Sequence, residues 1–430
     1  MSLKTQRGLF AGVAATALLG MTLTACSTSD TPPDASDGGD GVVVTIAASS
    51  TTAMDAVIEE FNKTDAGFTV ERVDTPTDSG AYRELIGTQL VGGTAADVLQ
   101  IPPGGGNNIS ARVAGADGYY LDLKDEAWAS DVPQAASEQL STEDGLLVAV
   151  PMVFASIGGI YNQTAIDEAG LEVPETWTDV LAFCADAKAA GKIAYGLGLS
   201  DAWTTQLIPY ALTSTLVYGA DPDFVADQAA GKATFSDSEW SEAMDMYTEM
   251  QTAGCFNEAP VGTPYAEVQD AVRAGTTLGT VSVSSEATAI KTGAAEDVEI
   301  TYAPLPATDE TDDTNLATSV GPAYGVNAAS KHIDQAKEFI AYLATPEAQL
   351  LFADTFGDTA AMAGDLTQDS QVVEVASGFV ADGKITTFPD RLWPNPTVQP
   401  ALFDGVQAMF NGQATGADVL TNMDNAFNAG

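Results

Sequence analysis

The folded part of the chain begins with an alternation of apolar strands and amphipathic helices. Residues Val42 to Ile46 form an uncharged, β-branched run that is typical of a buried strand. The following stretch, "TAMDAVIEEFNKTDAG", carries apolar side chains at helical spacing and ends in a glycine, which predicts a helix. "FTVERVD" then predicts a second strand, "YRELIGTQL" a second helix, and Val98 to Ile101 a third strand. This order indicates a mainly parallel sheet with helices on its faces.

The same alternation continues to the end of the chain. "DGLLVAVPMVFASIGGIYNQ" is a long extended run, and "TWTDVLAFCADAKAAGK" predicts a helix with Thr176 or Thr178 at its cap. "SDSEWSEAMDMYTEMQTAGC" predicts another helix, capped by Ser236 or Ser238. The last thirty or so residues predict two helices that are separated at Gly412. The pattern therefore predicts an α/β protein.

The first 41 residues do not fit this pattern. Lys4 and Arg7 precede an apolar run that is too short for a comfortable bilayer span, as in a signal peptide. The letters "LTAC" resemble the bacterial lipobox, in which the signal is cut before a cysteine that is then lipidated. We therefore expect a lipoprotein signal peptide at 1–25, a lipid on Cys26 and a disordered polar tether at 26–41. An ordinary signal peptide that happens to contain Cys26 is the alternative.

Composition narrows the function further. The chain has 430 residues and 45% hydrophobic content, enough for two lobes. Its net charge of −44 argues against a nucleic-acid partner. The single histidine, His332, and three cysteines offer neither a zinc cluster nor a catalytic triad. The acidic stretch "TDETDDTN" lacks the spacing of an EF-hand and is interpreted as a solvated loop. We expect no metal and no cofactor.

Four stretches, taken in order, carry a family resemblance. They are "MDAVIEEFNKTDAGFTVERV", "AVPMVFASIGGIYNQTAIDEAGLEVPETWTDVL", "GVNAASKHIDQAKEFIAYLATPEAQ" and "GQATGADVLTNMDNAF". From about Val42 onward the chain resembles the bacterial extracellular solute-binding proteins of carbohydrate ABC importers, a group that includes maltose-binding protein. The resemblance implies a monomeric receptor, exported and held at the outer face of the cell membrane, which delivers a carbohydrate to the permease subunits of an ABC transporter.

The resemblance also implies a two-lobe, type II-like periplasmic-binding-protein fold with the ligand cleft between the lobes. Hinge crossings are expected near 151–156, 320–325 and about 370. The lobes are expected to close on the ligand, because both contact it only in the closed form. Lobe one comprises 42–152 and 321–370, and lobe two comprises 153–320 and 371–430.

A sugar rests its apolar C–H face on aromatic rings, and its hydroxyls need polar side chains. "LSDAWTTQ" resembles the loop with which the maltose-binding member contacts sugar, which implies Asp201 and Trp203 as ligand-binding residues. On the crossing strand, Ala155 stands where that member has an acidic residue, which puts maltose itself in doubt. The remaining candidates are Phe154 and Ser156 on this strand, the lobe-one loop residues Ser49, Ser50, Thr51, Asn107 and Asn108, Ser284 and Ser285 where many relatives carry tryptophan, and the aromatic residues Tyr324, Trp393 and Phe403.

Several alternatives stay open at this point. Trp203 and Phe403 equally suit core packing, and the glycines of "PPGGG" suit either a close approach to ligand or a flexible loop. Cys184 and Cys255 both fall in lobe two of an exported protein, so we expect a disulfide, with two buried thiols as the alternative. The arginines form no cluster along the sequence, which disfavours phosphorylated ligands. A polyamine-binding protein and a secreted glycosidase remain the rival functions, although we expect no enzyme.

Overall fold

The computed structural model describes residues 41–429. The predicted signal peptide and Cys26 lie outside these residues. Within the described range, no helix is both long and apolar enough to cross a bilayer.

The first sheet has five strands in the order β2-β1-β3-β10-β4. It is built from β1 (Val42–Ala47), β2 (Phe68–Arg72), β3 (Val98–Gln100), β4 (Val150–Pro151) and β10 (Ala323–Val326). β1 pairs parallel with β2 and β3, whereas β10 is antiparallel to both of its neighbours. The prediction of a mainly parallel sheet is therefore confirmed for the first three strands.

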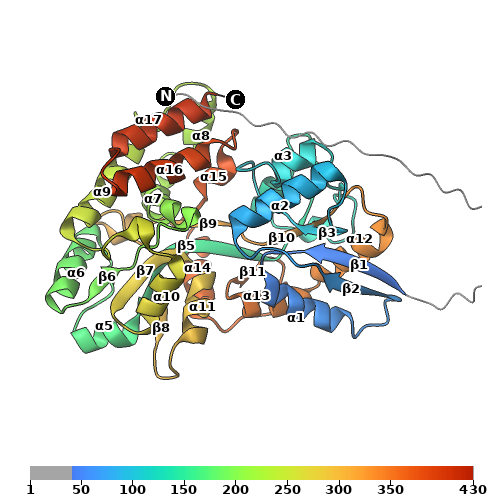
Figure 1. The fold of residues 1–430 in the computed structure, drawn as a ribbon, viewed down its shortest axis with the longest axis horizontal. Helices are drawn as coiled ribbons and strands as arrows, with labels where there is room; N and C mark the ends of the chain where they lie inside the picture. The colour runs from blue at the N-terminus through green and yellow to red at the C-terminus, as the bar shows by residue number, and fades with distance from the viewer. Residues whose placement is uncertain (1–40, 430) are drawn as a thin grey trace, which may run out of the picture. The chain divides into compact units, whose positions relative to one another are not determined.

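Helices cover both faces of this sheet, with α2 and α3 on one side and α1 and α13 on the other (Figure 1). The helices of this lobe are α1 (Thr51–Phe61), α2 (Ser79–Gly92), α3 (Ala111–Ala116), α4 (Gln134–Leu140), α12 (Ile333–Leu343) and α13 (Pro346–Phe356). The apolar stripe of α1 is buried, as its spacing predicts. Because β1 leads outward to β2 and the chain then returns to β3, the direction of winding reverses between β1 and β3.

The second sheet is mixed and is organised around one long strand, β5 (Val153–Asn162). β5 is antiparallel to β7, β8, β9 and the short β11, while β6 and β12 run parallel to their neighbours β7 and β9. The other strands are β6 (Ile193–Tyr195), β7 (Thr277–Val283), β8 (Ile300–Ala303), β9 (Leu316–Val320), β11 (Thr359–Ala360) and β12 (Ile385–Thr387).

The helices of the second lobe surround this sheet (Figure 1). They are α5 (Gln163–Ala169), α6 (Trp177–Ala189), α7 (Leu207–Thr213), α8 (Phe224–Ala229), α9 (Trp240–Ala253), α10 (Tyr265–Arg273), α11 (Ser285–Gly293), α14 (Gln371–Ala381), α15 (Pro389–Leu392), α16 (Val398–Phe410) and α17 (Gly416–Phe427). The two predicted C-terminal helices are confirmed as α16 and α17. The predicted helix cap at Thr176 is also confirmed, because its hydroxyl accepts from Asp179 N in a capping box.

The cap predicted for α9 is wrong. The helix begins at Trp240 with Glu239 as its N-cap residue, two or more places after either serine. The hydroxyl of Ser236 donates to the carboxylate of Asp424 on α17, and that of Ser238 donates to Phe235 O at 3.0 Å. Ser236 is therefore engaged before the helix, whereas Ser238 Oγ also accepts from Trp240 N at 3.4 Å. Sequence alone does not reveal the contact of Ser236 with α17.

The chain passes between the two sheets three times. β4 and β5 are separated by one residue, Met152, and β9 and β10 by Gly321 and Pro322. The third passage follows α13, where β11 pairs with β5 before the chain continues to α14. All three passages lie next to one another, because Met152 N donates to Pro322 O at 3.0 Å and Ala361 N donates to Met152 O at 3.0 Å. This arrangement gives two lobes that share one hinge region.

Each lobe has its own apolar core, one on each side of the hinge. In the second lobe the aromatic rings of Tyr210, Phe235, Trp240 and Trp393 pack together with centroid separations of 5.5–6.5 Å. The sulfur atoms of Cys184 on α6 and Cys255 after α9 lie 2.07 Å apart in the same core.

Candidate ligand-binding site

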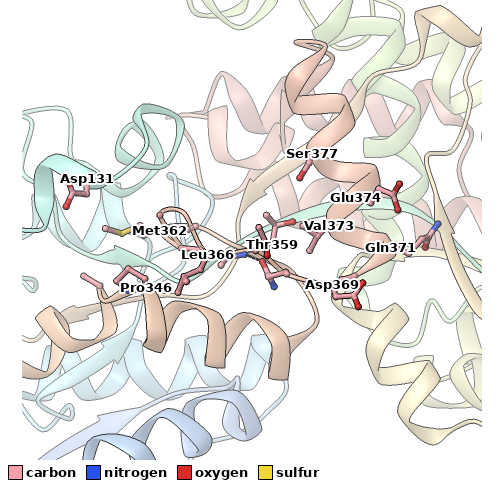
Figure 2. Close-up of a pocket in the computed structure, with 18 residues that line it drawn as sticks. Asp131, Pro346, Thr359, Met362, Leu366, Asp369, Gln371, Val373, Glu374 and Ser377 are labelled. Atoms are coloured by element: carbon pink, nitrogen blue, oxygen red, sulfur yellow. Dashed lines mark hydrogen bonds between the residues drawn. The ribbon is translucent and has the colours of Figure 1, made fainter.

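Two hollows near the hinge compete as binding sites. The larger, of about 990 Å³, lies beside the third passage, between the end of α13 and the start of α14 (Figure 2). It contains acidic and small side chains, including Asp131, Asp369 and Glu374, and none of the described residues that line it is aromatic. It offers no platform for the apolar face of a sugar, so we do not regard it as the site.

The smaller hollow is a cavity of about 300 Å³ between the two lobes, which we call the cleft cavity. Its first-lobe wall is formed by the residues that follow the carboxyl ends of β1 and β3. Ligands of open α/β sheets bind at such a place, where the winding of the sheet reverses between neighbouring strands. The other wall comes from the second lobe, and Ala155, Val320, Gly321 and Pro322 of the crossing strands form the back.

The first-lobe wall is held by one glutamine. Gln100 Oε1 accepts hydrogen bonds from Ser49 N at 2.8 Å and from Ser50 N at 3.1 Å, and it lies 3.4 Å from Tyr324 Oη. These contacts fix the loop between β1 and α1 at the cavity. Tyr82 Oη donates to backbone carbonyls behind the same loop and is itself buried.

Aromatic rings line the second-lobe wall. Trp203 is partly buried and packs edge-to-face against Tyr265, with ring centroids 5.0 Å apart. Asp201 supports this pair without lining the cavity, because its Oδ2 accepts from Tyr265 N at 2.7 Å. Phe403 on α16 and Phe388 before α15 complete the wall, with Phe356 from α13 on the first-lobe side. Together the rings provide apolar surface against which a sugar ring can rest.

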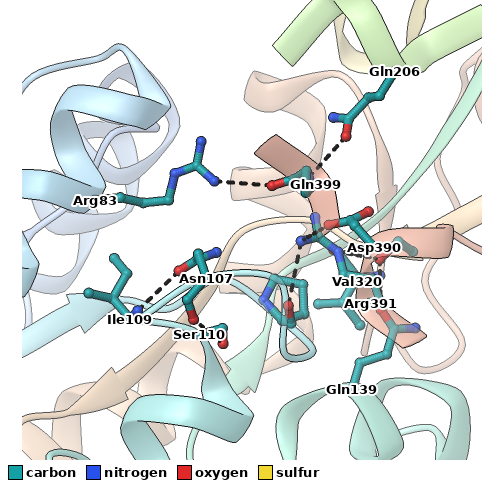
Figure 3. Close-up of polar contacts among 12 residues, drawn as sticks. Arg83, Asn107, Ile109, Ser110, Gln139, Gln206, Val320, Asp390, Arg391 and Gln399 are labelled. Carbon is teal, nitrogen blue, oxygen red and sulfur yellow. Dashed lines mark hydrogen bonds and ion pairs between the residues drawn. The ribbon is translucent and has the colours of Figure 1, made fainter. Parts of the chain in front are cut away.

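Two arginines and two glutamines form polar contacts across the cleft cavity (Figure 3). Arg83 Nη1 on α2 donates to Gln399 Oε1 on α16 at 3.4 Å, and Gln399 Nε2 donates to Gln206 Oε1 at 2.9 Å. Arg391 Nη1 lies 2.9 Å from Asp390 Oδ2, and its guanidinium carbon lies 6.0 Å from the centre of the Phe388 ring.

The electrostatics of this group follow from burial. Burial lowers the pKa of Arg83, and the neighbouring Arg391 guanidinium lowers it further. Burial also raises the pKa of Asp390, against the opposing effect of Arg391. Two like charges thus face the same cavity, and one buried carboxylate, that of Asp390, pairs with Arg391.

The "PPGGG" loop contacts the protein backbone rather than open space. A Cβ on Gly104 would lie 2.6 Å from Arg391 Cα, and one on Gly105 would lie 3.2 Å from Trp393 O. Gly104 also has φ +71°, a conformation that side chains rarely adopt. The glycines therefore let the first lobe approach the 390–393 segment of the second lobe closely.

The structure places six of the predicted ligand-binding residues on the walls of the cleft cavity. They are Ser49, Ser50, Asn107, Trp203, Ser285 and Phe403. Their role in binding stays a prediction, although the wall position agrees with the functional interpretation of Trp203 and Phe403.

The remaining predicted ligand-binding residues lie elsewhere. Phe154 and Ser156 face a separate apolar hollow on the other side of β5, because side chains alternate along a strand. Ser284 is buried and donates its hydroxyl hydrogen to Asp358. The others that do not line the cleft cavity are Thr51 at the start of α1, Asn108 beside Gly87, Asp201 behind Trp203, and the fully buried Tyr324 and Trp393.

Sequence reasoning missed several residues of the cavity. They are Tyr82, Arg83, Gln100, Gln206, Phe356, Phe388, Arg391 and Gln399. Gln100 had a usable signal, since it lies next to the end of the strand predicted for Val98 to Ile101, which follows the first βαβ unit. The others come from helices and turns whose positions at the cleft depend on the assembly of both lobes.

Comparison with known proteins agrees with this architecture. The family model described as bacterial extracellular solute-binding protein matches residues 47–350. The chain is 23% identical over 314 residues to the multiple sugar-binding protein of Streptococcus mutans, which covers 72% of this chain and 71% of that protein. It is 22% identical over 316 residues to the melibiose/raffinose/stachyose-binding protein MelE of Bacillus subtilis, which covers 71% and 70%.

The fold is also found in solved structures. The structure of SBP RafE in complex with raffinose superimposes with a TM-score of 0.74 at 20% sequence identity, covering 90% of this chain and 99% of RafE. The two-lobe fold expected from the sequence is thereby confirmed. The family match extends over most of the chain, and the chain therefore belongs to the bacterial extracellular solute-binding protein family.

Proposed function

We propose that this protein is the carbohydrate receptor of an ABC importer, anchored to the outer face of the cell membrane through Cys26. The observation that carries the proposal is the cleft cavity, in which both lobes supply aromatic rings and amide groups to one ligand-sized space. A ligand that contacts both walls favours the closed arrangement of the lobes, which the permease subunits then recognise. The relatives named for sugar binding support the choice of ligand class.

The rival functions suit the cavity less well. A glycosidase of the usual kind requires two carboxyl groups about 5–10 Å apart, but none of the described residues that line the cavity is Asp or Glu. A polyamine would place its own positive charges beside Arg83 and Arg391, where like charges repel. We therefore propose binding without catalysis.

A thermal-shift screen tests the receptor function. Neutral and acidic mono- and oligosaccharides are added to the purified mature protein, and at 100 times Kd a ligand stabilises the native state by about 2.7 kcal/mol. We expect Trp203→Ala to weaken the binding of any active sugar by about thirtyfold, because a buried aromatic contact contributes about 2 kcal/mol.

Trp177→Ala is the matched control, because Trp177 is also partly buried but lies outside the cleft cavity. It should leave the affinity unchanged. If no sugar raises the melting temperature, the receptor function is wrong.

Intact-mass spectrometry of the exported protein tests the anchor and the cysteines together. We expect a mature chain that begins at Cys26 and carries a lipid. We propose that Cys184 and Cys255 are joined in a disulfide. Without a reductant, an alkylating agent should therefore modify neither cysteine; with a reductant it should modify both. Cleavage at another residue would contradict the anchor, and alkylation before reduction would contradict the disulfide.

A further inference from the structure

The walls of the cleft cavity are positively charged in a strongly acidic protein. Arg83 and Arg391 both line the cavity, whereas the whole chain has 60 acidic residues and a net charge of −44. Asp390, only 2% exposed and 2.9 Å from Arg391 Nη1, offsets one of the two charges from behind the wall. The walls therefore carry two guanidinium groups against one buried carboxylate.

The amide groups of the first-lobe wall use their oxygen atoms within the protein. Gln100 Oε1 accepts from Ser49 N and Ser50 N, and Asn107 Oδ1 accepts from Ile109 N at 3.1 Å. Backbone N–H groups can only donate, so these contacts fix which end of each amide is the oxygen. The NH₂ groups of Gln100 and Asn107 make no hydrogen bond with any described residue. Both amides thus keep donors for a ligand.

On the second-lobe wall, too, the amide oxygen atoms are used in hydrogen bonds within the protein. Arg83 can only donate, so Gln399 must present its oxygen to Arg83 and its nitrogen to Gln206. Gln206 accepts through Oε1, and its Nε2 is left without a hydrogen bond in the described part of the chain. Because Arg83 can only donate, it determines which end of the Gln399 amide, and then of the Gln206 amide, is the oxygen.

A wall of donors selects a ligand with many acceptors. A sugar hydroxyl both donates and accepts, whereas a carboxylate or sulfate only accepts and matches the paired N–H groups of arginine. We propose that the ligand of the cleft cavity is an oligosaccharide that carries an acidic group, a carboxylate or a sulfate, bound between Arg83 and Arg391. This inference rests on the proposed function and names the substrate class of the same site.

The surroundings of the two arginines agree with this assignment. Arg391 is positioned by Asp390, by Ser319 Oγ at 3.3 Å from Nε and by the Phe388 ring, while its Nη2 makes no hydrogen bond with the residues that the structure describes. Burial lowers the pKa of Arg83, and the like charge of Arg391 lowers it further. A bound anion relieves that repulsion.

The test compares sugars that differ only in charge. Isothermal titration calorimetry at pH 7 measures binding of trigalacturonate, its fully methyl-esterified form, a sulfated galactan trisaccharide and its desulfated form. We expect one acidic member to bind at least tenfold more tightly than its neutral partner, and the identity of that member distinguishes carboxylate from sulfate. Arg83→Gln and Arg391→Gln should each remove this preference.

Arg273→Gln is the matched control, because Arg273 pairs with Asp270 at 2.7 Å on α10 and does not line the cavity. Arg273→Gln should retain the preference for the acidic sugar over its neutral partner. Arg391 also contacts backbone and Ser319, so Arg83→Gln alone carries the test if Arg391→Gln does not fold.

The outcomes separate this inference from the proposed function. Equal affinity for both members of each pair, or an unchanged preference in a folded Arg83→Gln variant, overturns the acidic ligand and leaves the sugar receptor intact. If only neutral sugars bind in the thermal-shift screen, the inference is likewise overturned. If no sugar of either kind binds, both are overturned.

Discussion

Replacing Trp393 with alanine should lower the free energy of unfolding by about 3–5 kcal/mol, the usual loss for a large aromatic residue in a packed core. Trp393 is 0% exposed and its ring lies 5.6 Å from Phe235, 6.0 Å from Tyr210 and 6.3 Å from Trp240, measured between centroids. Truncation would leave a cavity among three aromatic rings that edge-to-face contacts hold in place. Denaturant unfolding followed by circular dichroism measures the change.

Trp177→Ala again serves as the control, since Trp177 at the start of α6 is only partly buried. Trp177→Ala should lower the free energy of unfolding by well under half as much as Trp393→Ala does. Sequence reasoning names Trp393 as a candidate ligand-binding residue, and its burial indicates a structural role instead. A Trp393→Ala protein of wild-type stability that no longer binds sugar would contradict that assignment.

Individual helices were accessible from the sequence because each satisfies a local rule, whereas the two-lobe arrangement was implied by the family resemblance. The helix at α1 buries the apolar positions that its 3.6-residue period predicts, and α6 begins at the threonine that its capping box requires. The predicted cap of α9 is wrong for a physical reason, because Ser236 donates instead to Asp424 on α17, at the far end of the chain. Local patterns hold until a tertiary contact competes for the same side chain.

The residues that line the cleft cavity were harder to predict from the sequence than the helices were. Trp203 was found because its loop resembles a sugar-binding loop, and Ser49 and Ser50 because they follow a predicted strand. Strand alternation explains why Ala155 lines the cavity whereas Phe154 and Ser156, its neighbours, do not.

The arginines show a further limit of sequence reasoning. Arg83 and Arg391 lie in different lobes and far apart in sequence, so no cluster is visible along the chain. They meet only because α2 and α15 lie at the same cleft (Figure 3). The absence of an arginine cluster along the sequence, which disfavours phosphorylated ligands, therefore does not describe the cavity, since charge density in a folded protein depends on distance in space.

Replacing Gly104 with alanine should weaken sugar binding by roughly a hundredfold while leaving each lobe folded. The added Cβ would lie 2.6 Å from Arg391 Cα and 2.7 Å from Arg391 O, and backbone atoms cannot turn aside as the end of a side chain can. The lobes would have to separate by about 1 Å at this point, and a misplacement of that size weakens a site that needs groups from both sides. Calorimetric titration with the best ligand of the screen measures the change.

Gly118→Ala provides the matched control for backbone strain. Gly118 has φ +79°, close to the +71° of Gly104, but a Cβ there meets nothing within 4 Å. Both variants bear the same left-handed strain of roughly 1–2 kcal/mol, so any difference in affinity between them comes from the contact with Arg391. If both bind sugar equally well, the close approach of Gly104 to the second lobe plays no part in closing the cleft, and the glycines of this loop serve its turn alone.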